Sequence, residues 1–212
     1  MAVESRIAAR KLKIAEQRTP TQQRSIQRRE EILRTTASLL ERVGFDDLTT
    51  ILIAQELGIS VGSLYHYFPN KQAILYALGE QWLEEQTRAL EAIAEHDLES
   101  LDIPGFIEFS FPRLLKVYRE QRGLMPLVQA MWAVPELCDL DDRHDELVIS
   151  HLEKMFQRIG LTQGKSERER RARLLLELIH ALFLSIVEQS PARGKRSYRD
   201  VVALGVTLLE QP

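Results

Sequence analysis

Residues 58–62 read Gly-Ile-Ser-Val-Gly, which is the spacing that surrounds the nucleophile of many serine hydrolases. In those enzymes the serine lies on a strained turn between a strand and a helix, and a histidine and an acid activate it. Residues 53–57, which precede this motif, continue a helical pattern, and no other strand of an α/β fold is evident. We therefore predict that the chain is not an enzyme and that Ser60 is not catalytic.

A second candidate for chemistry is a group of acidic residues and histidines between positions 139 and 151. Its two histidines are seven positions apart, and the segment has neither a histidine pair at i, i+4 nor the pattern of a calcium loop. We interpret it as the solvated acidic start of a helix, which the helix dipole favours, and we expect neither a metal nor a cofactor. The group consists of Asp139, Asp141, Asp142, His144, Asp145, Glu146 and His151.

The residues that follow Ser60 suit contact with DNA. If residues 61–67 form a helix, Leu64 points inward and Gly62 lies on the opposite face. A glycine permits close backbone approach, serine, tyrosine and histidine can hydrogen-bond phosphates or base edges, and Val61 and Tyr65 can touch thymine methyl groups. Val61 and Phe68 share the inward face, Ser63 and His66 share the outward face, and Tyr65 and Tyr67 flank it. For Tyr65, packing between helices is the alternative.

Capping residues and glycines divide this region into short helices. After a helix over residues 22–42, Gly44 supplies a stop; Thr49 can cap a helix over 50–57, and Gly58 ends it. Ser60 can then cap the helix over 61–67, and Asn70 can cap a long one that follows. Two short helices joined by a glycine-containing turn are typical of a helix-turn-helix motif.

Residues 58–71, Gly-Ile-Ser-Val-Gly-Ser-Leu-Tyr-His-Tyr-Phe-Pro-Asn-Lys, with Leu-Thr-Thr at 48–50 and Ile-Ala at 53–54, closely resemble the signature of the tetracycline-repressor (TetR) family. The match covers about residues 29–75. It implies a DNA-binding transcriptional regulator, and it implies backbone contacts to DNA from Thr50 and Tyr67. At Ile51 some relatives carry a polar base-reading residue. The predicted DNA-binding residues are Thr50, Ser60, Val61, Gly62, Ser63, Tyr65, His66, Tyr67 and Lys71.

Lys71 is informative because a cation in the first turn of a helix opposes the helix dipole. Some other interaction must favour it there. A DNA phosphate held jointly by the lysine and the helix N-terminal amides would do so, and the resemblance implies that role.

The charge distribution points to DNA as well. Residues 1–29 hold eight Lys/Arg and two Glu, a net charge of +6, whereas the remaining 183 residues carry a net charge of −9. We expect residues 1–21 to form a flexible basic arm that lies in a minor groove or along phosphates; a free solvated tail is the alternative. The basic residues of this region are Arg6, Arg10, Lys11, Lys13, Arg18, Arg24 and Arg28.

The sequence as a whole predicts an all-α protein. We expect a helix-turn-helix domain at residues 22–71 and a helical ligand-binding and dimerisation domain at 72–212. Further helices are expected near 103–121, 124–133, 136–159, 167–190 and 197–210. No run of about 18 apolar residues and no signal peptide is present, so we expect a cytoplasmic protein with no membrane partner. The single cysteine, Cys138, cannot form an internal disulfide.

Residues 174–187 are apolar nearly all round, which is more than one packed face requires. With the last helix, this segment resembles the four-helix dimer interface of the family, two helices from each subunit. A two-fold homodimer would present two reading helices to a palindromic operator on double-stranded DNA; burial in a monomer core is the alternative. The apolar residues of the last helix are Val201, Val202, Leu204, Val206 and Leu208.

The resemblance implies a repressor that a small-molecule effector releases from DNA. A helix-turn-helix regulator controlled by a protein partner, with no small-molecule ligand, is the alternative. Aromatic and methionine side chains, among them Trp82 and Tyr118, offer lining for an apolar pocket, although most such residues are ordinary core. The candidate ligand-binding residues are Phe109, Gln129, Trp132 and His180, with Glu108 as a further polar contact.

Overall fold

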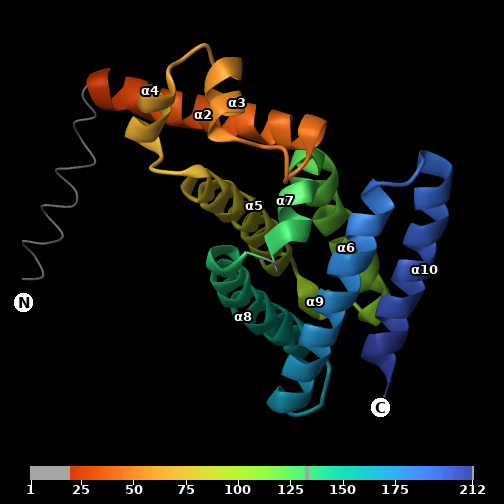
Figure 1. Cartoon of the computed structure of the whole chain (residues 1–212). Helices are drawn as coiled ribbons and strands as arrows, with labels where there is room; N and C mark the ends of the chain where they lie inside the picture. Colours follow the sequence, from red (N-terminus) through yellow and green to blue (C-terminus); the bar gives the residue numbers. More distant parts are fainter. Residues whose placement is uncertain (1–19, 132–133, 212) are drawn as a thin grey trace, which may run out of the picture.

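The computed structural model describes residues 20–131 and 134–211. Within these ranges the chain forms α-helices and two 3-10 turns, with no strand, which confirms the predicted all-α class (Figure 1). The N-terminal arm up to residue 19 and Trp132 lie outside the described residues. The elements are α2 (Pro20–Val43), α3 (Thr50–Glu56), α4 (Val61–Tyr67), α5 (Lys71–Ala94), η1 (Leu98–Ser100), α6 (Ile103–Glu120), η2 (Arg122–Leu124), α7 (Met125–Ala130), α8 (Pro135–Arg158), α9 (Lys165–Val187) and α10 (Pro191–Glu210).

The predicted caps start α3, α4 and α5. The side chains of Thr49, Ser60 and Asn70 each accept a hydrogen bond from the amide three residues further on, at 3.1, 3.0 and 2.8 Å. Each bond satisfies an amide that has no partner inside its own helix. Gly44 and Gly58 follow α2 and α3 with φ angles of 78° and 64°, a conformation that favours glycine. Local sequence signals thus set where α3, α4 and α5 begin and where α2 and α3 end.

The last helix begins earlier than predicted. We expected the last helix near residues 197–210, but α10 begins six residues earlier, at Pro191. Proline is favoured in the first turn of a helix because its missing N–H group has no partner there anyway. The short connection from α9 therefore turns the chain directly back, and α10 packs along α9 and α6.

The larger part of the molecule is a bundle in which α5, α6, α8 and α9 enclose the core and α10 covers one side (Figure 1). Trp82 of α5 is buried at its centre, edge-on to Tyr118 of α6, with ring centroids 4.9 Å apart. Gly205 brings α10 close to α6, since a Cβ atom there would lie 2.7 Å from the ring of Phe111. None of the described helices combines the length and the apolar character needed to cross a bilayer.

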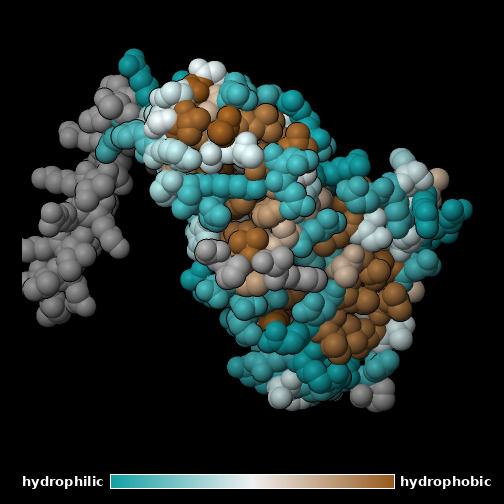
Figure 2. Space-filling view, in the orientation of Figure 1, coloured by the Kyte–Doolittle hydropathy of each residue, from teal (hydrophilic) through white to brown (hydrophobic). Residues whose placement is uncertain are grey.

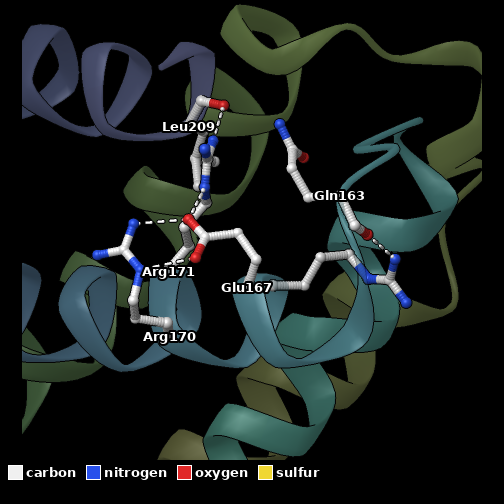
Figure 3. A network of polar contacts seen from close by, with 6 residues as sticks. Gln163, Glu167, Arg170, Arg171 and Leu209 are labelled. Atoms are coloured by element: carbon white, nitrogen blue, oxygen red, sulfur yellow. Dashed lines mark hydrogen bonds and ion pairs between the residues drawn. The ribbon is translucent and has the colours of Figure 1, made fainter. Parts of the chain in front are cut away.

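A buried arginine joins the two C-terminal helices (Figure 3). Arg171 of α9 is 1% exposed; it donates to the backbone carbonyl of Leu209 near the end of α10 at 2.8 Å and to the Glu167 carboxylate at 3.0 Å. Arg170 donates to the same carboxylate at 2.6 Å. These hydrogen bonds lower the pKa of Glu167 to about 2. The network supplies a partner for a helix-end carbonyl that the helix itself leaves unsatisfied.

The N-terminal helices rest on the bundle through α2, which contacts η2 and α7. Gly123 in η2 lies at this contact: a Cβ atom there would be in van der Waals contact with the backbone oxygen of Ala37 at 3.4 Å and with the Glu41 carboxylate at 3.5 Å. The two parts of the molecule are therefore in backbone-level contact at this point.

Candidate functional site

Helices α3 and α4 form the predicted helix-turn-helix, and the predicted inward face of α4 is confirmed. Leu64 and Phe68 are 0% and 2% exposed, and Val61 is half-buried against the same core. Gly62, Ser63 and His66 are exposed on the other side. The outward face therefore consists of a backbone without a side chain and of hydrogen-bonding groups, which suits close approach to a DNA groove.

Two side-chain hydrogen bonds order the exposed face. The Ser60 and Ser63 hydroxyl oxygens are 2.8 Å apart. The Tyr65 hydroxyl lies 3.2 Å from Oγ1 of Thr50, which links α4 to the start of α3. Tyr65 is 47% exposed, so its ring is not packed away between helices. Tyr67 is half-buried, with its ring edge-on to His66 at 5.4 Å.

Lys71 has intramolecular partners at the start of α5. Its ammonium group donates to the backbone carbonyl of Phe45 at 2.9 Å and lies 4.9 Å from the centroid of the Phe45 ring. Burial lowers the pKa of Lys71, and nearby Asp46 partly offsets this effect. The Phe45 carbonyl, the Phe45 ring and the Asp46 carboxylate all attract the Lys71 ammonium group. They offset its unfavourable interaction with the helix dipole, so a DNA phosphate is not needed to explain a lysine at this position.

Ile51 is the residue of this face whose use sequence reasoning left open. It lies in the first turn of α3, next to Thr50, and is 57% exposed. An exposed apolar side chain beside α4 can contact the methyl group of a thymine. A polar residue at this position would not favour that contact.

A second candidate site is an internal cavity of about 40 Å³ between α5, α6, α8 and α9. Its walls are mainly apolar, with a few polar groups that converge on it, as in many small-molecule sites. A volume of this size has room for a few water molecules. The lining residues are Trp82, Leu83, Gln86, Leu90, Leu114, Tyr118, Asp141, His144, Asp145, Val148, Leu152, Leu176, Ile179 and His180.

The ionisable groups of the cavity have shifted pKa values. Burial, together with nearby Asp141 and Glu177, raises the pKa of Asp145 to about 7. Burial lowers the pKa of His144 to about 4 and also lowers that of His180. Both imidazoles are therefore largely neutral at pH 7. The His180 Nδ1 atom lies 2.9 Å from the hydroxyl of Tyr118.

Of the candidate ligand-binding residues, only His180 is among the described residues that line this cavity. Phe109 is half-buried elsewhere on α6, stacked on His96 with ring centroids 4.1 Å apart. Gln129 is exposed and lines a separate polar depression with Glu41, Arg122 and Glu188. Trp132 lies outside the described residues.

The interpretation of the acidic segment as solvated was wrong for three of its seven residues, Asp141, His144 and Asp145. Because α8 begins at Pro135, the segment lies within the helix and not at its start. Asp141, His144 and Asp145 are spaced i, i+3 and i+4, so they share one helix face, and that face lines the cavity. The same spacing was the signal that sequence reasoning missed. Asp139, Asp142 and Glu146 are exposed, and no group of three or more potential ligands among the described residues is arranged to hold a metal ion.

Comparison with known proteins places the chain in a family. The model of the family of bacterial regulatory proteins called the tetR family matches residues 32–78. The tetracyclin repressor-like C-terminal domain matches residues 102–209, which is half of the chain. The chain belongs to the TetR family. It is a DNA-binding transcriptional regulator and not an enzyme, as the sequence predicted.

Relatives of this TetR-family protein include regulators with established names. The chain is 27% identical over 160 residues to the HTH-type transcriptional regulator BetI 2 of Chromohalobacter salexigens, with 74% of this chain and 76% of the relative covered. It is 37% identical over 89 residues to the class A tetracycline repressor of transposon 1721 from Escherichia coli, with 42% and 40% covered. A TetR-family regulator from Marinobacter aquaeolei has the same fold, with a TM-score of 0.67 at 18% identity over 85% of this chain and 90% of that one.

Proposed function

We propose that this protein is a homodimeric repressor that binds a palindromic operator and leaves it when a small-molecule effector enters the internal cavity. The observation that carries the DNA part is the exposed face of α4, where Gly62, Ser63 and His66 point away from the core that buries Leu64. We infer that these residues, with Thr50 and Tyr65, read the operator. An equal preference for any DNA duplex would contradict the proposal.

A footprint on the promoter regions next to the gene tests this function. Purified protein is expected to protect a two-fold symmetric site whose halves lie about one helical turn or a multiple of it apart, because a dimer's two reading helices must enter successive major grooves on one side of the duplex. A reporter behind the protected promoter is expected to be expressed more strongly when the gene is deleted. Lower expression would identify an activator.

The apolar surface of α9 and α10 supports the dimer. Figure 2 shows a hydrophobic patch over these two helices. Leu174 of α9 is 43% exposed and Leu204 of α10 is 49% exposed. Leucines with this exposure on adjacent helices are typical of protein–protein interfaces. Val201, which we expected in the interface, is 2% exposed and belongs to the core of the protomer. The interface we propose therefore uses the half-buried and exposed apolar residues of α10.

Leu204→Glu is expected to convert the dimer to a monomer, because dimerisation would bury a carboxylate in an apolar interface. Sedimentation velocity should show a dimer dissociation constant that is at least about 100-fold higher than that of the wild type. Operator affinity should fall as the dimer dissociates. Leu147→Glu on α8 is the matched control, since Leu147 is 39% exposed outside this surface. Equal dimerisation by both variants would contradict the interface.

The basic arm is expected to add non-specific affinity for DNA. Deletion of residues 1–21 removes five of the chain's Lys/Arg residues and two glutamates, so operator binding should weaken and its dependence on salt concentration should flatten. The measurement is the slope of log K against log salt for both proteins. An unchanged slope would show that the arm does not contact phosphates.

The cavity favours a small-molecule effector over control by a protein partner alone. Mainly apolar walls with a few convergent polar groups are typical of small-molecule sites, which supports an effector that enters this cavity. A metabolite that stabilises the protein against heat and also lowers its operator affinity would identify the effector.

A further inference from the structure

The cavity between α5, α6, α8 and α9 carries an excess of negative charge. Its described lining contains the carboxylates of Asp141 and Asp145 but neither lysine nor arginine. The two histidines that also line it have pKa values lowered by burial, so they do not supply a positive charge at pH 7. Glu177 of α9 adds a further carboxylate close enough to act on Asp145.

Asp145 is the least compensated of these groups. The described part of the chain offers its carboxylate neither a hydrogen bond nor an ion pair, although the residue is half-buried. Arg173, whose charge acts on Asp145, donates to Glu146 at 2.7 Å. A half-buried carboxylate without a partner is costly to ionise. A cation in the cavity would remove that cost.

Gln86 supplies an independent sign of a missing ligand. It lines the cavity from α5, is 8% exposed, and its amide nitrogen has no hydrogen-bond partner among the described residues. Buried polar groups in native proteins are nearly always paired. A primary amide can present either its oxygen or its NH2 group to a ligand, because rotation about χ3 exchanges them.

The aromatic walls suit a cation as well. Trp82 and Tyr118 both line the cavity and meet edge to face. The faces of such rings attract positive charge, most strongly where water is excluded. An anionic ligand would instead meet the carboxylates of Asp141 and Asp145, which repel it.

We propose that this cavity binds a small organic cation, for which Asp145 is the counter-ion and Trp82, Tyr118 and Gln86 form the remaining wall. The inference rests on the proposed function, because it assigns the chemical class of the effector. The cavity of about 40 Å³ is smaller than an aromatic amine, so binding must displace the surrounding helices. That displacement is the means by which the ligand can distinguish two conformations of the protein.

The pH dependence of binding follows from the same group. Asp145 faces Asp141 and Asp142 on its own helix, Glu177 and Arg173 on α9, and Tyr118 on α6. Its pKa is raised to about 7, so the carboxyl is mostly neutral at pH 6 and mostly ionised at pH 8. A permanently charged ligand prefers the ionised form. Its affinity should therefore rise as the pH rises from 6 to 8.

Calorimetric titration of the full-length protein with three probes of similar size tests the charge preference. Benzylamine is cationic at pH 6 to 8, benzyl alcohol is neutral and benzoate is anionic. Benzylamine is expected to bind at least about tenfold more tightly than the alcohol at pH 8, and benzoate to bind more weakly than the alcohol. The proposal is overturned if benzylamine binds no more tightly than benzyl alcohol. It is also overturned if none of the three probes binds.

The substitution Asp145→Asn tests whether Asp145 is the counter-ion, and Asp139→Asn is its control. Asp139 is an exposed carboxylate on the same helix. The Asp145 variant is expected to lose about tenfold in benzylamine affinity at pH 8 and to lose the dependence on pH, whereas the Asp139 variant keeps both. Retention of the pH dependence in the Asp145 variant would overturn the assignment.

Operator binding by the same preparations separates this inference from the proposed function. Protein that binds its operator and shows no preference for the cation refutes the cation site alone. Protein that binds benzylamine through Asp145 and recognises no specific DNA refutes the proposed repressor and leaves the cation site supported.

Discussion

Gly62→Glu is expected to abolish specific operator binding while the fold stays intact. A Cβ atom at Gly62 would meet only the Ser60 hydroxyl, at 3.8 Å, so the new side chain projects into solvent. Glutamate is also a better helix former than glycine, by somewhat less than about 1 kcal/mol. Against DNA the same side chain adds volume and a negative charge beside phosphates, which should weaken operator affinity by about 3 kcal/mol or more, or about 100-fold.

The matched control for this prediction is Gly164→Glu. Gly164 precedes α9, is exposed, and has no atom within 4 Å of an added Cβ, so the change in charge and size is identical. Fluorescence anisotropy with the labelled operator should show normal binding by this variant and none by the Gly62 variant, while both unfold cooperatively within a few degrees of the wild-type temperature. Wild-type affinity in the Gly62 variant would exclude the outward face of α4 from the DNA interface.

Arg171→Met is expected to produce the largest loss of stability. Methionine keeps much of the buried volume but removes the donor to the Leu209 carbonyl and to Glu167. The buried Leu209 carbonyl then loses this donor, and a buried acceptor left without a partner typically costs about 1–3 kcal/mol. Urea unfolding should show a lower midpoint with an unchanged slope. Because Arg171 holds the end of α10, the variant should also dimerise more weakly.

Arg170→Met separates burial from charge in this network. Both arginines bind the Glu167 carboxylate, but Arg170 has a side chain that is 55% exposed. Solvent screens an exposed ion pair, so its removal should change the unfolding midpoint much less. Equal losses from the two substitutions would show that the ion pair, and not the buried contact with α10, is responsible.

The N-terminal domain could be predicted from sequence because its signals are local. The caps at Thr49, Ser60 and Asn70 and the glycines at 44 and 58 act on neighbouring residues, and the inward position of Leu64 follows from helical geometry. The start of α10 was mistaken because a proline both ends helices and begins them. Which of the two it does depends on the residues that follow.

The cavity could not be located in the same way, because its walls come from four helices far apart in the chain. The i, i+3, i+4 spacing of Asp141, His144 and Asp145 was present in the sequence, but nothing local shows that their face meets Gln86 of α5. An acidic helix face is usually solvated, and only packing reveals this exception. The burial of Val201 within the protomer likewise depends on how α10 lies against its neighbours.

The contact at Gly123 has a mechanical consequence. There η2 lies against the backbone of α2 at Ala37 and against the Glu41 side chain, so a shift of η2 reaches α2 through atoms already in contact. In the dimer that we propose, a tilt of α6 that moves η2 would therefore be passed to α2. We expect such a movement of the bundle to change the distance between the two α4 helices.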